Sequence, residues 1–435
     1  MTARTTPVPS VVIILLVLIM FPPASAIDPF WTYSTQGAKI GGVSVSSDGS
    51  GIAVGAEKVL LVSGNGELLA KEAYGDQVLF TPDGANLLSS FGSSVYFFQR
   101  NATQSSFKKK WDYELPGKVR STDISDDGKI IIAAGESGGT YVFSGAGKLT
   151  GGNTNYSAVL RLSHNGQRIL GASAFSLCRY SSTGDGFCYD NVSMVSQPDV
   201  MEMTGSGSTV IFNDDQRLVS VNTYNGAERW KSRSTSDITA LAMISSGTKI
   251  LVGTRNGNID LFDDKGNLLW TYATNPAGTP AFGVREVALS DDGMIAVAGT
   301  YEGVTVALDA AGKEIWSNVT QDHINYIAMS GNGSLVIAAG EETVYAFSSS
   351  AQYRPATQSP PVTLQTAQNT PLPVMIVPET TALQKTAETT RSATQAVTLV
   401  PTTYSVIRTA TQSPVPALLP LLGVLGAVFV LMKRR

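Results

Sequence analysis

Residues 284–316 read VREVALSDDGMIAVAGTYEGVTVALDAAGKEIW, and their pattern decides the fold. Three short apolar runs follow one another at 284–289, 295–299 and 304–308, and the turn Ser290-Asp291-Asp292-Gly293 joins the first two. Apolar runs of this length, bounded by Asp-Gly or Asn-Gly turns, are typical of antiparallel strands in tight hairpins. Trp316, four residues after Gly312, marks a fourth run. The segment therefore predicts four short antiparallel strands.

The same turn recurs along the chain about every 40 residues. Its glycines are Gly49, Gly84, Gly128, Gly166, Gly207, Gly247, Gly293 and Gly333, with steps of 35, 44, 38, 41, 40, 46 and 40 residues. Four short strands in each repeat of this length form one blade of a β-propeller. We therefore expect an all-β propeller of eight four-stranded blades at 27–350, or of seven blades if the degenerate unit at 201–213 is not a blade.

The tryptophans indicate how the ring closes. Trp31, Trp111, Trp230 and Trp316 stand 17 or 18 residues before the next turn glycine. Trp31 therefore occupies a fourth-strand position with no blade before it, whereas the last unit, at 324–348, supplies only three strands. We expect residues 30–33 to be the fourth strand of the last blade, because closure removes the exposed edges of the array.

Two of the repeats resemble those of a known family. LFDDKGNLLW at 261–270 and ALDAAGKEIW at 307–316 are similar to the A-x-D-x-x-T-G-x-x-x-W docking repeat of PQQ-like (quinoprotein-type) eight-bladed propellers, a WD-repeat-like architecture, although both lack the Thr. Members range from quinone-dependent dehydrogenases to non-enzymatic assembly scaffolds, so the fold leaves the function open. In that family the Trp packs between neighbouring blades. The resemblance and the shared spacing assign this blade-docking role to Trp31, Trp111, Trp230, Trp270 and Trp316.

Both ends of the chain resemble targeting segments. An apolar run at 11–21 lies between Arg4 and Ala24-Ser25-Ala26, which predicts a secretory signal peptide at 1–26, with a retained anchor as the alternative. Residues 415–432 carry no charge and precede Lys433-Arg434-Arg435. This pattern predicts one transmembrane helix at 415–432 and a cytoplasmic basic tail at 433–435, with a processed sorting signal as the alternative. We expect an archaeal or bacterial surface protein in the cell membrane, with its N-terminal domain outside.

A low-complexity segment at 351–414 separates the repeats from this apolar end. Of its 64 residues, 34 are Ser, Thr, Pro or Gln, and 15 are Thr. Such a segment buries too little apolar surface to offset the entropy of ordering it. We therefore expect a disordered, extended stalk.

Composition excludes several classes of function. The chain has 435 residues but only 2 His and 2 Cys, which is too few for most metal or nucleophile chemistry, and we expect no cofactor. The net charge of −4 is unevenly distributed, because residues 27–350 alone carry about −10. An acidic propeller excludes nucleic acid as the partner.

Few residues are candidates for chemistry. Cys178 and Cys188 are symmetric about residue 183 and belong to an exported chain, so we expect a disulfide, with two free buried thiols as the alternative. Asp322 and His323 lie on a fourth-to-first-strand loop and are kept as channel-mouth candidates, although one His beside one Asp is little evidence for an acid–base pair. His164 is interpreted as a solvated turn residue.

Other motifs have structural interpretations. The Asp-Asp-Gly turns at 126–128 and 291–293 lack the spacing of a calcium loop and predict Asx-type turns. The basic run Lys108-Lys109-Lys110 predicts a charged strand edge that resists pairing. Five sequons, which are common by chance, give possible N-glycosylation sites at Asn101, Asn155, Asn191, Asn318 and Asn332.

Two functional hypotheses follow. The first is a non-enzymatic, membrane-tethered extracytoplasmic propeller that binds another envelope protein or a glycan. The second is an extracytoplasmic enzyme that handles a quinone or a sugar in the propeller channel. Acidic, basic or His side chains that converge on the channel from three or more blades would favour the second hypothesis, and short Gly-rich loops at its mouth would favour the first.

Overall fold

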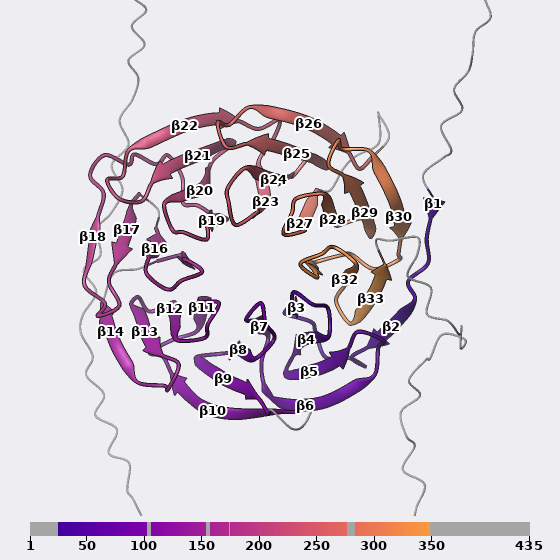
Figure 1. Cartoon of the computed structure of the whole chain (residues 1–435), viewed down its shortest axis with the longest axis horizontal. Helices are drawn as coiled ribbons and strands as arrows, with labels where there is room; N and C mark the ends of the chain where they lie inside the picture. The colour runs from indigo at the N-terminus through magenta and orange to yellow at the C-terminus, as the bar shows by residue number, and fades with distance from the viewer. Residues whose placement is uncertain (1–24, 102–105, 154–156, 174, 276–282, 349–435) are drawn as a thin grey trace, which may run out of the picture. The chain divides into compact units, whose positions relative to one another are not determined.

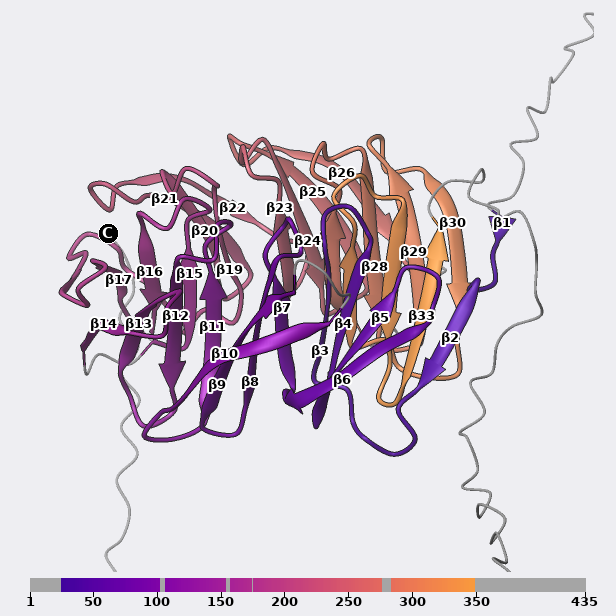
Figure 2. The ribbon, with the colours of Figure 1, turned by 60° about the horizontal axis from the view of Figure 1, so that its bottom comes forward.

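The protein is an eight-bladed β-propeller. The computed structural model describes residues 25–101, 106–153, 157–173, 175–275 and 283–348, and these residues contain strands, turns and bends but no helix. The strands form eight sheets around one axis, as Figure 1 shows in face view and Figure 2 in a tilted view. The prediction of eight blades is confirmed, because the degenerate unit at 201–213 supplies the first two strands of a complete sheet.

Blades 1 to 4 follow one another in the first half of the ring. Blade 1 consists of β3 (Gly42–Val45), β4 (Gly51–Ala56), β5 (Lys58–Ser63) and β6 (Leu68–Tyr74). Blade 2 consists of β7 (Gln77–Phe80), β8 (Asn86–Phe91), β9 (Ser94–Arg100) and β10 (Phe107–Glu114). Blade 3 consists of β11 (Val119–Ile124), β12 (Ile130–Gly135), β13 (Thr140–Ser144) and β14 (Leu149–Asn153). Blade 4 consists of β15 (Val159–Leu162), β16 (Ile169–Ala172), β17 (Leu177–Tyr180) and β18 (Gly186–Cys188).

Blades 5 to 8 complete the ring. Blade 5 consists of β19 (Met201–Met203), β20 (Thr209–Asp214), β21 (Arg217–Asn222) and β22 (Glu228–Arg233). Blade 6 consists of β23 (Ile238–Met243), β24 (Lys249–Thr254), β25 (Asn258–Asp263) and β26 (Leu268–Ala273). Blade 7 consists of β27 (Val284–Leu289), β28 (Ile295–Thr300), β29 (Val304–Asp309) and β30 (Glu314–Val319). Blade 8 consists of β31 (Tyr326–Met329), β32 (Leu335–Ala339), β33 (Thr343–Ser348) and the N-terminal β2 (Trp31–Ser34).

The ring closes through the pairing of β2 with β33. Trp31 pairs with Ala346 and Ser34 with Thr343 in an antiparallel register, so the N-terminal strand completes the sheet made by the last three strands. Figure 1 shows the indigo β2 beside the orange β33. The predicted closure is therefore confirmed. A further short strand, β1 (Ser25–Ala26), lies parallel to the outer strand β30 of blade 7.

The core lies between neighbouring sheets. Every residue of β4, β16 and β32 is buried, because these second strands have strands on both sides and blades on both faces. The outer strands β22 and β26 show exposed and half-buried residues instead. One core cluster joins Leu88 and Phe97 of blade 2 to Ile131 and Phe143 of blade 3. The blades thus depend on each other for their apolar burial.

The repeated turn is fixed by its first and third residues. In blade 7, Ser290 Oγ donates to Asp292 Oδ1 (2.7 Å) and accepts from the backbone N of Ile295 (3.0 Å). Asp292 Oδ1 accepts from the backbone N of Met294 (2.9 Å), and Gly293 adopts a left-handed φ of 64° that favours glycine. The turns that begin at Ser46, Thr81 and Ser125 repeat these side-chain bonds.

Tryptophan side chains link four of the eight blades to the third-to-fourth-strand turn of the next blade. The indole Nε1 donates to a backbone carbonyl there in four cases: Trp31 to Gly64 (3.1 Å), Trp111 to Gly145 (3.1 Å), Trp230 to Asp264 (2.7 Å) and Trp270 to Ala310 (3.1 Å). In blade 4, which lacks a Trp, the hydroxyl of Tyr189 donates to the carbonyl of Thr223 in blade 5. Sequence analysis missed this role of Tyr189.

Trp316 differs from the other four tryptophans. It is 3% exposed and stacks on Phe347 of blade 8, but its Nε1 has no hydrogen-bond partner within the described part of the chain. The reason is the ring closure, because the fourth strand of blade 8 is the N-terminal β2, and β33 is therefore not joined to it by the kind of turn that accepts the other indoles.

The predicted targeting segments and the stalk lie outside the described residues, apart from Ser25 and Ala26. This applies to residues 1–24 of the signal peptide, to the stalk at 351–414, and to the apolar segment and basic tail at 415–435. Within the described ranges, no helix has the length and apolar character needed to cross a membrane.

The contrast between Trp31 and Trp316 gives a test of the docking bond. Replacing either by Phe removes similar buried volume, but only Trp31→Phe also removes a hydrogen bond, worth about 1 kcal/mol. We expect Trp31→Phe to lower the free energy of unfolding in urea by about 1 kcal/mol more than Trp316→Phe. Equal losses for the two variants would contradict the role of the Trp31 Nε1 bond.

Candidate functional site

One position of the repeat carries a small side chain in some blades and a large or charged side chain in others. It lies two residues before the first residue of each turn, on the innermost strand of each blade. In blades 6, 7, 8 and 1 it is small: Ala242, Ala288, Ala328 and Ser44. In blades 2 to 5 it is Leu79, Asp123, Arg161 and Glu202. Three consecutive inner strands, β11, β15 and β19, thus place one charged side chain each at the same level of the ring.

These three side chains are held by specific contacts. Arg161 donates from Nε (3.2 Å) and NH2 (3.0 Å) to Oε1 of Glu202 across the blade interface. Asp123 accepts the backbone N of Leu162 (2.7 Å) at Oδ2 and that of Ile124 (2.8 Å) at Oδ1. The side chains of Arg161 and Glu202 each remain 28% exposed. The cluster is therefore deep in the ring but is not sealed from solvent.

A fourth charged group approaches from blade 7. Burial raises the pKa of Glu286 on β27 to about 7, and the negative charge of Glu202 raises it further while Arg161 opposes the shift. Burial likewise raises the pKa of Asp123 to about 6, against the attraction of Arg161 and two backbone hydrogen bonds. Two carboxyl groups of this cluster therefore change protonation in the neutral range.

A cavity of about 430 Å³ extends from this cluster to the turns at one end of the inner strands, and we call it the axial cavity. Blades 2 to 5 line it with apolar side chains such as Leu79, Phe80 and Met203, and with Asp123, Arg161 and Glu202. The turn residues Pro82, Asp126 and His164 lie at its rim. Nδ1 of His164 lies 3.4 Å from Oδ2 of Asp126 and 3.4 Å from Oγ of Ser245.

Backbone hydrogen bonds join the turns at this rim into a near-continuous ring. The second residue of one turn donates its N–H to the carbonyl of the second residue of the next turn at six of the eight blade interfaces. The bonds run from Ser47 to Pro82, Asp126 to His164, His164 to Gly205, Gly205 to Ser245, Asp291 to Gly331 and Gly331 to Ser47. Pro82 has no N–H to donate to blade 3. The rim is therefore built from short, rigid turns with mostly small residues.

The candidates Asp322 and His323 lie elsewhere. They precede β31, whereas the turns of the rim follow the inner strands, and neither residue lines the axial cavity. They line a separate pocket of about 360 Å³ with Ser34, Glu341 and Glu342 of blade 8 and its loops. His323 stacks on Tyr301, with ring centroids 3.7 Å apart, and Asp322 Oδ2 accepts the hydroxyl of Tyr345 (2.6 Å). The two side chains thus contact different partners.

The two cysteines lie opposite each other on β17 and β18. Cys178 pairs with Cys188 in the antiparallel register, and the two sulfurs form a disulfide bond. This bond joins the third and fourth strands of blade 4, whose fourth strand lacks a Trp.

The sequons fall into different settings. Asn191 and Asn332 are exposed, and Asn101 is an exposed residue at the end of blade 2's third strand. Asn318 is half-buried, and its Nδ2 donates to the carbonyl of Ile27 (2.7 Å), so its amide is engaged within the fold. Asn155 lies outside the described residues.

Sequence analysis missed Asp123, Arg161, Glu202 and Glu286. Arg161 and Glu202 are single charges in apolar inner strands, Leu160-Arg161-Leu162 and Met201-Glu202-Met203, whereas the strands of Asp123 and Glu286 also contain Arg120 and Arg285. Aligning the eight repeats on their turns would have placed the first three at one position. Within the described ranges, no group of three or more His, Cys, Asp or Glu side chains is arranged to hold a metal ion.

Part of the chain matches a family model. Residues 192–395 are similar to the PQQ_2 family, described as outer membrane protein assembly factor BamB, and this match covers less than half of the chain. Among curated proteins, none matches this sequence.

Solved structures of similar fold include Sqt1 proteins and a WD40 domain. Sqt1 of Chaetomium thermophilum, bound to the N-terminus of the ribosomal protein L10, has a TM-score of 0.63 with 14% identity, over 74% of this chain and 99% of that one. Sqt1 of Saccharomyces cerevisiae has a TM-score of 0.63 with 12% identity, over 74% of this chain and 99% of that one. The C-terminal WD40 domain of Sif2 has a TM-score of 0.63 with 12% identity, over 75% of this chain and 99% of that one. At these identities the similarity shows the fold alone.

The raised pKa of Glu286 predicts how stability depends on pH. A carboxyl whose pKa is higher in the folded state favours folding at low pH and loses that contribution as pH rises through about 7. Glu286→Gln mimics the protonated form. We expect this variant to unfold like the wild type at pH 5, within about 1 kcal/mol, and to be more stable by about 2 kcal/mol at pH 9 in urea titrations.

Glu202→Gln is the matched control for this prediction. It removes a carboxylate of the same cluster but leaves Arg161 without its ion-pair partner, so it should destabilise the fold at both pH values. A Glu286→Gln variant with the pH profile of the wild type would show that Glu286 is fully hydrated in the folded state.

Proposed function

We propose that this chain is a non-enzymatic binding module, exported and tethered to the cell membrane by its C-terminal apolar segment, which holds another envelope protein at the rim of the axial cavity. The observation that carries the proposal is the asymmetry of the ring. Among the described residues, only those of blades 2 to 5 line the axial cavity, and Asp126 at its rim is a carboxylate of an acidic propeller.

The charge of the rim favours a cationic partner. Burial raises the pKa of Asp126, with His164 opposing the shift and Asp127, Asp291 and Asp83 adding to it. Asp126 thus lies in the field of three other carboxylates, of which Asp127 is already paired with Lys129. A lysine or arginine side chain of a protein partner would lower this repulsion. A neutral glycan would leave it unchanged.

The form of the rim also favours binding over catalysis. The loops there are short turns joined by backbone bonds, and the residues at their second positions include Ser47, Gly205, Ser245 and Gly331. Such loops are too short to close over a substrate. The similar Sqt1 propeller, which holds the N-terminus of another protein, supports a protein partner for this fold.

A specific observation supports the second candidate function, an enzyme that handles a quinone or sugar. Charged side chains converge from blades 3, 4, 5 and 7, and two of them, Asp123 and Glu286, have pKa values raised to about 6 and 7. Carboxyl groups tuned in this way serve as general acids in enzymes. Hydrogen bonds and ion pairs within the cluster account for Arg161 and Glu202 without a substrate.

The binding proposal is tested by reversing charge at the rim. Asp126 occupies a turn position that is Ser47, His164 or Gly205 in other blades, so Asp126→Lys should leave the turn intact. We expect this variant to lose at least tenfold in affinity for the partner captured from native envelopes by the full-length chain. The partner should also dissociate in about 0.5 M salt, because rim charges are screened.

Asp190→Lys, an exposed charge reversal after β18, is the matched control and should retain binding. Equal binding by both variants would contradict a charged rim interface. Retention of a quinone by the purified chain, or turnover of alcohols or sugars with an added electron acceptor, would instead establish the enzyme.

A further inference from the structure

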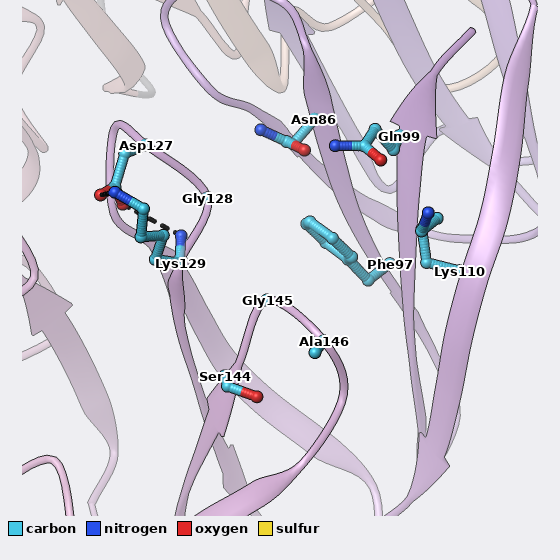
Figure 3. A pocket seen from close by; sticks show the side chains of 10 residues that line it. All are labelled: Asn86, Phe97, Gln99, Lys110, Asp127, Gly128, Lys129, Ser144, Gly145 and Ala146. Carbon is cyan, nitrogen blue, oxygen red and sulfur yellow. Dashed lines mark hydrogen bonds and ion pairs between the residues drawn. The ribbon is translucent and has the colours of Figure 1, made fainter.

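A second pocket, of about 480 Å³, lies between blades 2 and 3 and shares no lining residue with the axial cavity. Figure 3 shows Asn86 and Gln99 close together on one side, with Phe97 and Lys110 next to them. The Asp127–Lys129 pair of blade 3 lies on another side, and Ser144 and Ala146 border the pocket below in this view. Its volume is within the range of small-molecule sites.

Asn86 is a largely buried residue whose side-chain amide lines the pocket. Its side chain is 7% exposed, lies against Gly128 of the next blade, and forms no hydrogen bond with any described residue. The amide nitrogen and oxygen are not sealed from solvent, because the pocket leaves them accessible. The pocket lets Asn86 reach a ligand, which would satisfy the amide.

Equivalent positions in other blades explain why Asn86 is unusual. Each lies five residues after the first residue of its turn, and an apolar side chain fills the interface at Ile130, Ile295 and Leu335. Where the residue is polar and long, it has a partner. Lys249 donates to the carbonyl of Gly293 (2.6 Å), and Arg168 lies over the ring of Tyr224.

Gln99 departs from the repeat in the same blade. Gln99 pairs with Asn86 in the register of β8 and β9. In other blades, the residue equivalent to Gln99 accepts hydrogen bonds from the turn that leads to the fourth strand. Asp263 and Asp309, for example, each accept two backbone N–H groups of that turn. Gln99 is exposed and has no hydrogen-bond partner among the described residues, so its amide is available to a ligand.

One free cation completes the pocket. Lys110 is the extra residue of a β-bulge, because Lys109 pairs with Phe98 and Trp111 with Phe97, and bulges re-aim side chains. Lys109 is bound to Asp112 (2.6 Å) and Lys129 to Asp127 (2.8 Å). Lys110 has no anionic partner in the described ranges, so the pocket carries a net charge of about +1. Part of the predicted charged strand edge thus lines a pocket.

We propose that this pocket binds an acidic saccharide, with a hexuronate unit as its ligand. Side-chain amides both donate and accept hydrogen bonds, which matches the paired hydroxyl groups of a sugar ring, and Asn86 and Gln99 supply two such amides side by side. Lys110 binds the carboxylate. Phe97, which is 3% exposed and stacks on Trp111, and Ala146 form the apolar part of the pocket lining. This site is independent of the protein interface proposed above.

The proposal is tested on the full-length chain by calorimetry and saturation-transfer NMR. The probes are the disaccharides of galacturonate, glucuronate and mannuronate, with α-1,4-galactobiose as the neutral counterpart of the first. We expect at least one uronate to bind at least tenfold more tightly than galactobiose. Failure of all three to bind would overturn the proposal, as would equal binding of a polyglutamate peptide, which would assign the pocket to acidic protein segments.

The variants separate the three contacts. Lys110→Gln should weaken the uronate at least tenfold without affecting galactobiose, whereas Lys108→Gln, on the same strand but outside the pocket, should change neither more than twofold. Asn86→Leu introduces the residue of the equivalent blade 8 position and should abolish binding of both sugars. Gln99→Ala, at an exposed position, gives the same test without altering the buried interface. Binding that survives both amide variants would overturn the site.

Discussion

The pairing of β2 with β33 is the constraint on which the rest of the structure depends. Each blade buries its second strand only because another blade covers each face, so an open array would leave one face of blade 1 and one of blade 8 exposed. The N-terminal strand completes blade 8, and Trp31 at its start joins blade 8 to the turn of blade 1. Closure therefore supplies at one interface both the missing strand and the docking side chain.

In the closed ring, the blade interfaces are not all linked in the same way. Backbone bonds between turns link six of the eight interfaces, and Pro82 removes the link between blades 2 and 3 because proline has no N–H. That interface depends on the Trp111 bond to Gly145 and on the cluster that includes Phe97 and Phe143. The same interface contains the pocket at Asn86, so this pocket lies at an interface that has no backbone hydrogen bond between its rim turns.

The sequence predicted the fold well because the fold is repeated. Turn glycines at regular steps gave the blade count, and the position of Trp31 gave the closure. The axial cluster was not predicted, because Asp123, Arg161 and Glu202 lie about 40 residues apart and meet only when three blades are brought into the same register. Asp322 and His323 were selected for their place on a fourth-to-first-strand loop; they line a pocket other than the axial cavity and contact Tyr345 and Tyr301 separately. Local patterns report turns and strands, whereas this site depends on inter-blade contacts.

A repeat protein offers an internal standard for recognising functional residues. Every blade has the same structural task, so a polar residue that departs from the repeat needs its own explanation. Lys249 and Arg168 depart from it and have partners, so packing explains them. Arg161 and Glu202 are each other's hydrogen-bonded ion-pair partner, so a structural role accounts for the axial cluster as well as a functional role does. Among the described residues, the side chain of Asn86 has no hydrogen-bond partner, and it lies beside Gln99 and Lys110, whose side chains have none there either. By this standard, the interface between blades 2 and 3 is the part of the described ring that structure alone explains least.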